Sequence, residues 1–377
     1  MTTPPPEAIT WAEVDLAAYR ANVHALQQWV GPRVQVFAVV KANAYGHGLV
    51  PVARAALQAG AARLVVHRLE EGLALRAAGI TAPILLLGYV PLAAAETVAR
   101  ARLIPTVITL DFLRALGAHA PADAPHPVHI NVDTGMGRYG LLPHEVVDFL
   151  RAASGIPGVQ VEGIYTHFAT ADEADTTYLR HQWRVFGEVL AAVQAAGLMP
   201  PLRHACNSAA IFALPEAHLD AVRPGIATYG LQPSAAWPAP VPLKPVLTWK
   251  SRVARVRTLP AGSSIGYGRT FVTQKPTTVA LVPVGYGDGY VRRLSNRAQV
   301  LVRGQRAAVL GRVSMDQIVV DVSHIPGVRL EDEVVLVGCQ RGACIPAEEV
   351  AAWAETINYE VTTLLLPRVR RVYVDGG

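Results

Sequence analysis

The sequence predicts an α/β protein with two domains, an N-terminal (β/α)8 TIM-like barrel followed by a mostly antiparallel β domain. Short apolar runs alternate with alanine-rich amphipathic segments up to about residue 230. A proline-rich stretch fills residues 231–245, and segments of alternating apolar and polar residues follow it. We therefore expect the barrel at residues 1–242 and the β domain at 243–377, with roughly the first 12 residues pairing with the β domain.

The barrel prediction depends on apolar runs that each suit a buried parallel strand. In chain order they are VQVFAVV (34–40), RLVV (63–66), ILLLG (84–88), IPTVI (104–108), VHINV (128–132), VEGIYTHF (161–168), LRHAC (202–206) and LDAVRPG (219–225). Helix-like segments separate them, including VARAALQAG, EEGLALRAAG, AAAETVARAR, PHEVVDFLRAA and residues 178–196. Eight runs alternating with helices are typical of a closed barrel of parallel βα units.

The second domain is predicted from a change in the spacing of apolar residues along the chain. Its strand-like segments are VLTWKSRVARVRTL, TTVALVPVGYG, AQVLVRG, AAVLGRV, QIVVDV and DEVVLVG. Only residues 346–356 have a helical pattern there. Alternation with a period of two indicates strands with one buried face, as in antiparallel sheets.

Composition excludes several classes of protein. With 51% hydrophobic and 17% charged residues over 377 positions, the chain is globular, and no apolar run is long enough to cross a bilayer. The start, MTTPPPEAIT, lacks the basic and apolar regions of a secretory signal. Three irregularly spaced cysteines (206, 339 and 344) give neither a zinc pattern nor a disulfide framework. We expect a cytoplasmic protein with no metal and no membrane partner.

The net charge of +5 is concentrated in the second domain. Residues 1–242 carry 16 Lys and Arg against 18 Asp and Glu, whereas residues 243–377 carry 18 against 11. A basic half can indicate nucleic-acid binding. Here the arginines interleave with Val and Leu, which places them on a wet strand face, and no aromatic-rich RNA motif accompanies them. No nucleic-acid partner is predicted.

Polar residues follow several predicted barrel strands at the point where each strand ends. They are Lys41, the DTGMGR segment at 133–138, His167, Asn207, Ser208, Arg223 and Gly225. Each alone has an ordinary structural explanation, such as a hydrogen-bonded strand-end histidine or a glycine turn. Because the carboxyl ends of barrel strands meet on the active-site face, their convergence favours a functional site.

The chemistry of this set suggests a phosphate-bearing carbonyl cofactor. Ser208 opens a predicted short helix, and Gly225 with Ile226 offers backbone amides, an arrangement that suits phosphate. A buried lysine amine that condenses with a carbonyl is the usual attachment of pyridoxal phosphate. A sugar-phosphate barrel enzyme with a Schiff-base lysine would show much the same residues, so the pattern alone leaves both open.

Nine motifs in order along the chain resemble the alanine racemase family. They are AVVKANAYGHG, VDTGMGRYG, GIYTHFATAD, RHACNSAA, VRPGIATYG, SIGYGRTF, VGYGDGY, GRVSMDQ and TINYEV. The resemblance implies a barrel, a C-terminal β domain and a homodimer with shared active sites. It also implies pyridoxal 5'-phosphate as cofactor and interconversion of L- and D-alanine, the latter for peptidoglycan.

The resemblance also implies catalytic roles. Lys41 resembles the Schiff-base lysine, which also acts as the base on one face of the substrate α-carbon. Tyr267 matches the tyrosine base on the other face, supplied by the second subunit, because racemisation needs a proton removed from one face and returned on the opposite one. His167 and Arg223 match the groups that orient this tyrosine, and Arg223 also matches the donor to the cofactor's pyridine nitrogen.

Further matches concern binding. Arg138 matches the arginine that contacts the cofactor's phenolic oxygen and the substrate carboxylate, and His204 the histidine beside the cofactor ring. Positions matching the phosphate side are Tyr45, Asn207, Ser208, Gly225, Ile226 and Tyr359. Met315 and Asp316 match the other-subunit loop at the substrate carboxylate. Tyr286 and Tyr359 match the pair that narrows the mouth of the site, which favours alanine because excluding size is easier than rewarding one methyl group.

One position departs from the family pattern. Many members place a carbamylated lysine two residues before the aspartate of DTGMGR, where its negative charge holds the arginine. Here that position is Asn131, so we expect a bound anion such as chloride, or a side-chain carboxylate, beside Arg138. The same residue occurs in some broad-specificity racemases, so a broad-specificity or serine racemase is the main alternative. A barrel-type decarboxylase and a non-catalytic cofactor carrier are the others.

Overall fold

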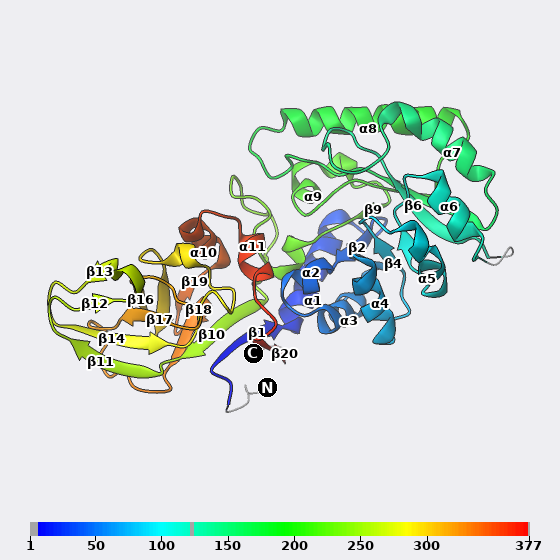
Figure 1. Ribbon diagram of the computed structural model, residues 1–377. Coiled ribbons are helices and arrows are strands. Elements are labelled where there is room, and N and C mark those ends of the chain that lie inside the picture. Colours follow the sequence, from blue (N-terminus) through cyan, green and yellow to red (C-terminus); the bar gives the residue numbers. More distant parts are fainter. Residues whose placement is uncertain (1–6, 121–123, 376–377) are drawn as a thin grey trace.

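The computed structural model describes residues 7–120 and 124–375 and has two parts, a barrel and a large antiparallel sheet (Figure 1). The barrel strands are β2 (Gln35–Val39), β3 (Arg63–Val66), β4 (Ile84–Leu86), β5 (Ile104–Pro105), β6 (His126–Asn131), β7 (Val159–Tyr165), β8 (Leu202–His204) and β9 (Ala221–Val222). They pair in parallel in the order β5-β4-β3-β2-β9-β8-β7-β6. A parallel bridge between Thr106 and His129 brings the two edges together. The predicted fold class is confirmed.

The strands form where the sequence supplies continuous apolar runs. In β2, β3 and β4 nearly every residue is buried, because the barrel interior covers one face of each strand and a helix covers the other. The surrounding helices are α1 (Leu16–Val30), α3 (Leu49–Gln58), α4 (Leu69–Ala77), α5 (Ala95–Arg100), α6 (Leu110–Gly117), α7 (Val146–Ser154), α8 (Thr177–Ala195) and the short α9 (Ala210–Ala213). Asp15 caps α1, accepting a hydrogen bond from the Ala18 amide.

The second part is a sheet with the order β11-β14-β17-β16-β15-β18-β10-β1-β20, and β19 pairs with β18. Its strands are β1 (Thr10–Asp15), β10 (Leu247–Arg252), β11 (Arg255–Leu259), β14 (Thr277–Val282), β15 (Gln299–Val302), β16 (Gln305–Leu310), β17 (Ile318–Asp321), β18 (Glu333–Gln340), β19 (Ala343–Ile345) and β20 (Arg370–Val374). Strands β12 (Ser264–Ile265) and β13 (Phe271–Val272) form a separate small hairpin. Strand β10 buries every second residue, as an antiparallel strand with one wet face does.

The two chain ends join the two parts. Strand β1 pairs with β10 and with β20, and it leads directly into α1 of the barrel. Arg371 on β20 donates hydrogen bonds to the carbonyls of Leu365, Leu366, Val369 and Gly46. The last of these lies in the loop after Lys41, so β20 braces the barrel loop that carries the lysine.

The second part holds one helix more than the sequence predicted. Helix α10 (Ala347–Ala354) lies within the expected segment 346–356, but α11 (Asn358–Thr363) was not expected. The Asn358 side chain donates to the Gln232 carbonyl and to the Glu348 carboxylate. Helix α11 contacts α2 (Lys41–Tyr45) at the junction of the two parts, so it brings second-domain residues to the barrel mouth (Figure 1).

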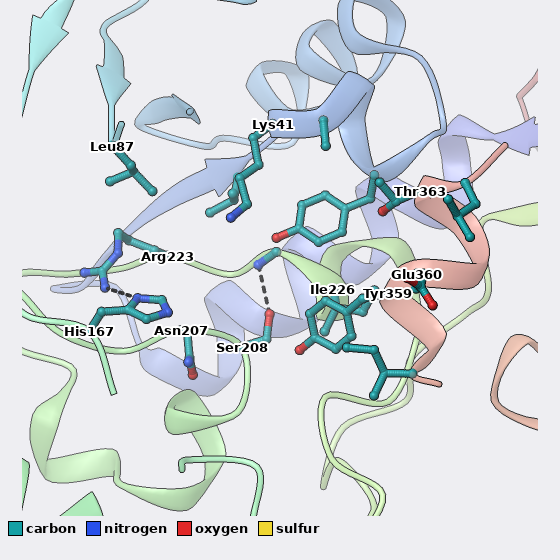
Figure 2. Close-up of a pocket in the computed structure, with 16 residues that line it drawn as sticks. Lys41, Leu87, His167, Asn207, Ser208, Arg223, Ile226, Tyr359, Glu360 and Thr363 are labelled. Atoms are coloured by element: carbon teal, nitrogen blue, oxygen red, sulfur yellow. Dashed lines mark hydrogen bonds between the residues drawn. The ribbon is translucent and has the colours of Figure 1, made fainter. Parts of the chain in front are cut away.

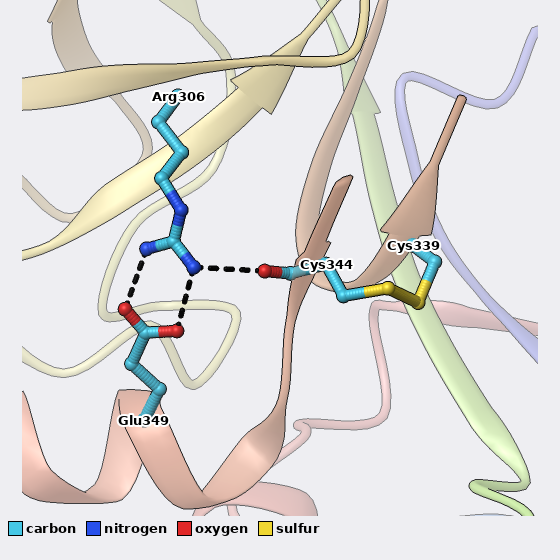
Figure 3. Close-up of a disulfide and its surroundings, with 4 residues drawn as sticks. All are labelled: Arg306, Cys339, Cys344 and Glu349. Carbon is cyan, nitrogen blue, oxygen red and sulfur yellow. Dashed lines mark hydrogen bonds and ion pairs between the residues drawn. A yellow bond between two sulfur atoms is a disulfide. The ribbon is translucent and has the colours of Figure 1, made fainter. Parts of the chain in front are cut away.

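The expectation that the cysteines form no disulfide is wrong. Cys339 on β18 and Cys344 on β19 face each other across the hairpin and are joined by a disulfide (Figure 3). Cys206 is buried and free. The disulfide removes the support that the cysteines gave to a reducing compartment, and a cytoplasmic location stays a prediction. In the described part of the chain, no helix is long and apolar enough to cross a membrane.

Candidate active site

A cavity of about 500 Å³ opens at the carboxyl ends of the barrel strands. Figure 2 shows Lys41, Arg223, His167, Ser208 and Tyr359 directed into it. Its lining contains most of the residues predicted for the cofactor, namely Lys41, Tyr45, Asn207, Ser208, Arg223, Gly225, Ile226 and Tyr359. It also contains His167, which was predicted to orient the tyrosine base. The structure therefore brings together residues that follow four strands, β2, β7, β8 and β9, and one residue of α11.

Lys41 stands directly after β2 and lines this cavity. Burial lowers the pKa of its amine, and the positive charges of Arg138 and Arg223 lower it further against the opposing effect of Glu71. A lowered pKa increases the fraction of uncharged amine near neutral pH, which is the form that attacks a carbonyl. The half-buried position of Lys41 at the strand end is thus suited to nucleophilic chemistry.

The backbone after Lys41 follows a left-handed turn. Ala42, Asn43, Ala44 and Tyr45 all have φ between 52° and 54°. Such a conformation costs roughly 1–2 kcal/mol per residue for L-amino acids, so the surroundings must hold it. Glu71 accepts from the Ala42 amide at 2.6 Å, and Asn43 accepts from the Leu49 amide at 2.9 Å.

The left-handed turn after Lys41 directs the Tyr45 side chain toward the cavity. Its ring packs against Tyr229 and Tyr359 at centroid distances of 4.8 and 6.2 Å. Burial raises the pKa of the Tyr45 hydroxyl, so it stays protonated and can donate a hydrogen bond. A Cβ atom on Gly225 would lie 2.3 Å from this hydroxyl oxygen, so only glycine fits the space beneath Tyr45.

Ser208 organises the neighbouring backbone. Its Oγ accepts from the Gly225 amide at 2.8 Å and from the Ala227 amide at 3.3 Å. The prediction that Ser208 opens a helix is corrected, because α9 begins at Ala210 and Asn207 accepts from the Ala210 amide. With both amides bound, the serine hydroxyl hydrogen remains free to point at a ligand. The Gly225 amide, expected to be available to a phosphate, instead donates to Ser208. The neutral Ser208 hydroxyl is a donor of the kind that suits a phosphate group.

Arg223 is buried on the floor of the cavity. Its Nη2 donates to the carbonyls of Thr166 (2.8 Å) and Ala205 (2.9 Å) and lies 3.2 Å from His167 Nδ1 (Figure 2). Burial lowers the pKa of Arg223 to about 10, which still leaves it a cation at neutral pH. Burial, and then the charge of Arg223, hold the pKa of His167 well below its ordinary value. His167 is therefore neutral and can accept from the guanidinium.

His204 does not line the cavity. It lies behind Arg223, whose Nη1 is 2.6 Å from His204 Nδ1. Its ring stacks on Tyr165 at 4.7 Å between centroids. The structure thus places His204 behind Arg223 and outside the lining of this cavity, and its position beside the cofactor ring stays a prediction.

Arg138 and Asn131 line a second cavity that shares Lys41 and His167 with the first. The Asp133 carboxylate accepts from the amides of Gly135, Met136, Gly137 and Arg138, which orders the DTGMGR loop. Asn131 Nδ2 donates to the Tyr139 carbonyl at 2.7 Å, while its Oδ1 is buried without a partner. Within residues 7–120 and 124–375, no carboxylate forms an ion pair with Arg138, so the bound anion is the expectation that remains.

Four predicted residues of the second domain, unlike Tyr359, lie apart from these cavities. Tyr267, Met315 and Tyr286 are 70%, 53% and 40% exposed, and neither they nor Asp316 line the two cavities around Lys41. Asp316 pairs with Arg368 at 2.8 Å. A single chain therefore does not bring Tyr267 to Lys41.

Sequence reasoning missed Glu71, which braces the turn after Lys41. Its Oε2 also accepts from the His67 and Arg68 amides at 2.9 and 3.0 Å. Glu71 follows β3 at the same edge of the barrel, so the strand-end rule that selected Lys41 would also have found it. Glu360 and Thr363, on the unexpected α11, line the cavity as well.

Comparison with known proteins gives consistent matches. The family "Alanine racemase, N-terminal domain" matches residues 14–233, and "Alanine racemase, C-terminal domain" matches residues 246–373. Alanine racemases of Desulfovibrio desulfuricans and Symbiobacterium thermophilum are 47% and 50% identical, covering 97% and 98% of this chain and 98% and 97% of their own lengths.

Solved structures agree. The alanine racemase of Bacillus anthracis with bound L-Ala-P has a TM-score of 0.91 and 40% identity, covering 98% of this chain and 96% of its own. That of Bartonella henselae, with covalently bound pyridoxal phosphate, has a TM-score of 0.87 and 33% identity, covering 97% of this chain and 100% of its own.

Proposed function

The chain belongs to the alanine racemase family of isomerases, and we propose that it interconverts L- and D-alanine with pyridoxal 5'-phosphate bound at Lys41. The observation that carries this proposal is the convergence of the Lys41 amine, the Arg223 guanidinium and a cup of hydroxyl donors in one cavity of about 500 Å³. That volume lies within the range of small-molecule pockets. The family match and the relative with covalently bound cofactor support it.

The residues fit this cofactor. Lys41 has the lowered pKa that a covalent link to an aldehyde needs. Tyr45, Ser208, Tyr359 and the backbone at Gly225 and Ile226 would hold the phosphate, with Asn207 bracing α9 beside them. When bound, the cofactor supplies an electron-withdrawing ring that acidifies the substrate's α C–H bond.

Arg223 would face the ring nitrogen of the cofactor. A guanidinium only donates hydrogen bonds, and at neutral pH it carries its charge permanently, so it leaves that nitrogen unprotonated. With Arg223 there instead of a carboxylate, the bound ring would withdraw electrons less strongly. This disfavours side reactions such as transfer of the amino group, and it favours return of the proton to the same carbon.

Two bases on opposite faces complete the reaction. Lys41 removes or returns the α-proton on one face, and Tyr267 of the partner subunit acts on the other. The exposure of Tyr267 and its absence from the Lys41 cavities support a homodimer in which each site uses both subunits. His167, held by Arg223, is the group that orients this tyrosine.

The substrate side is formed by Arg138 and by partner residues. Arg138 binds the substrate carboxylate, and an anion such as chloride beside Asn131 supplies the missing negative charge. Met315 and Asp316 of the partner subunit flank the carboxylate, and Tyr286 with Tyr359 limits the side chain to a methyl group. We further propose the domain division at residues 242 and 243, and a role in supplying D-alanine for peptidoglycan.

The experiment that tests this proposal is chiral product analysis of the purified enzyme with pyridoxal phosphate. L-alanine, L-serine, L-lysine and L-arginine are supplied separately. D-alanine forming far faster than any other product supports a dedicated alanine racemase. Because Asn131 replaces the family's charged lysine, the alternative is a broad-specificity racemase, which comparable turnover of serine or the basic amino acids would favour. If every substrate keeps its handedness, the proposal fails.

A further inference from the structure

A continuous hydrogen-bonded chain runs through the barrel interior from Glu162 to Arg223. Glu162 Oε2 lies 3.2 Å from His129 Nε2, His129 Nδ1 lies 2.8 Å from His204 Nε2, and His204 Nδ1 lies 2.6 Å from Arg223 Nη1. His129 and His204 are fully buried and Arg223 is 3% exposed. Four elements contribute, namely β7, β6, β8 and the segment after β9.

The two ends of this chain fix its direction. A guanidinium can only donate and a carboxylate can only accept. His204 Nδ1 must therefore accept from Arg223, and its Nε2–H must donate to His129 Nδ1. The His129 Nε2–H then donates to Glu162. Burial lowers the pKa of both imidazoles, and in His204 the charge of Arg223 adds to that effect, so neutral rings agree with this assignment.

The surroundings hold the chain in place. Arg63 binds Glu162 through two hydrogen bonds of 2.7 Å. Although burial alone would raise the pKa of Glu162, the hydrogen bond from His129 and the contacts with Arg63 lower it to about 2. Gly163 lies opposite His129 in the sheet, and a Cβ atom there would be 2.5 Å from His129 Nδ1. Glycine thus leaves the space that the imidazole occupies.

This row of polar groups is costly in a barrel interior. Apolar side chains of similar volume would fill the space without removing charges from water, so stability alone does not explain it. The one member of the row that lines the proposed cofactor cavity is Arg223. The other members are therefore placed to act through Arg223.

We propose that His129 and Glu162 are positioning residues, which act through His204 to hold the Arg223 guanidinium in one orientation toward the cofactor's ring nitrogen. This inference rests on the proposed function. Nη2 of Arg223 already serves the carbonyls of Thr166 and Ala205, and Nη1 gives one hydrogen to His204. The other Nη1 hydrogen stays available, in a plane that the chain fixes.

Neutron diffraction from deuterium-exchanged crystals of the holoenzyme tests the chain directly. The expected result is deuterium on Nε2 of both His129 and His204, with none on either Nδ1. Deuterium on Nδ1 of either ring would reverse the direction of the chain and overturn the proposal. This readout does not depend on racemase activity, so it separates failure of the positioning chain from failure of the proposed function.

The functional consequence is tested with Glu162→Gln. A neutral amide can donate as well as accept, so the direction of the chain is no longer fixed. The kcat of the Glu162→Gln variant should fall about ten- to hundredfold, which is the range expected for the loss of one charge-assisted hydrogen bond. KM for alanine should change less than about twofold, because Glu162 lies away from the substrate. The absorption band of the bound cofactor should shift.

Asp220→Asn is the matched control. Asp220 pairs with Arg203 at 2.7 Å, and its side chain is 28% exposed against 24% for Glu162, but its hydrogen bonds run to Arg203 and not to Arg223. This variant should keep wild-type kcat and cofactor absorption. Wild-type kcat in Glu162→Gln, or an equal loss in both variants, would overturn the proposal. If Glu162→Gln does not fold, the neutron result alone decides.

Discussion

Replacing Gly225 by alanine should weaken cofactor binding through a single close contact. The new Cβ would lie 2.3 Å from Tyr45 Oη and 3.0 Å from Tyr45 Cζ. The Tyr45 ring cannot turn aside easily, because it is 9% exposed and packs against Tyr229 and Tyr359. The backbone before it is the left-handed turn that Glu71 and Asn43 hold.

The size of the expected loss of binding follows from the overlap between the new Cβ atom and the Tyr45 hydroxyl. Overpacking a well-filled site costs about 1–3 kcal/mol, which corresponds to about a 5- to 150-fold rise in the Kd for pyridoxal phosphate. The double variant Gly225→Ala with Tyr45→Phe removes the closest atom. The cost of the alanine should therefore fall by roughly half or more in the Tyr45→Phe background, which a double-mutant cycle measures as a coupling energy.

The assay is titration of cofactor-free protein with pyridoxal phosphate, followed by absorbance. Gly187→Ala is the control, because Gly187 lies within α8 and a Cβ there meets nothing within 4 Å. That variant should leave the Kd unchanged and stabilise the helix by about 0.5–1 kcal/mol. An equal cost of Gly225→Ala with and without the Tyr45 hydroxyl would refute the contact as the cause.

Three further predictions concern stability and the junction of the two parts. Replacing Cys339 and Cys344 by serine should lower the free energy of unfolding by about 2 kcal/mol without changing kcat, because the disulfide no longer restricts the unfolded chain to a short closed loop. Urea unfolding measures the loss of stability, and a loss of activity would contradict the prediction. The destabilisation by Glu162→Gln should be present at pH 7, shrink as pH falls below 4.5 and vanish near pH 2. The reason is that the Glu162 carboxylate contributes to the free energy of unfolding only above its lowered folded pKa. A constant difference in unfolding free energy across urea titrations from pH 7 to pH 3 would contradict this prediction. Asn358→Ala should cost about 1–3 kcal/mol, because the Gln232 carbonyl loses its donor and the Glu348 carboxylate keeps only the Gln232 amide. It should also raise the cofactor Kd through neighbouring Tyr359, and an unchanged Kd would argue against α11 as part of the site.

The barrel and most of its cavity could be predicted because both follow from local patterns. Parallel strands such as β2 and β3 are continuous apolar runs, and polar residues that follow them must gather at one face. Lys41, His167, Ser208 and Arg223 were all selected this way, and all line one cavity.

What the sequence did not predict depends on long-range placement. Helix α11 contains the poor helix formers Val361, Thr362 and Thr363, and hydrogen bonds of Asn358 to residues far along the chain hold its start. The Cys339–Cys344 disulfide depends on the register of the β18–β19 hairpin, which spacing alone does not give.

His129 also escaped prediction. It lies in the apolar run VHINV, and its role emerges only where the register of β6 and β7 shifts and sets it opposite Gly163. No short sequence window contains both that shift and the distant Glu162, His204 and Arg223.

The central claim, that Lys41 of one subunit and Tyr267 of the other complete each site, is tested most directly by mixing two inactive variants. Lys41→Ala and Tyr267→Phe are unfolded together, refolded and assayed for alanine racemisation. Random pairing into symmetric dimers should restore about one site in four, in subunits that retain Lys41 beside a partner that retains Tyr267. Activity near that level is the predicted result. If each variant is inactive alone and the refolded mixture regains nothing, while refolded wild type recovers fully, the shared site is contradicted.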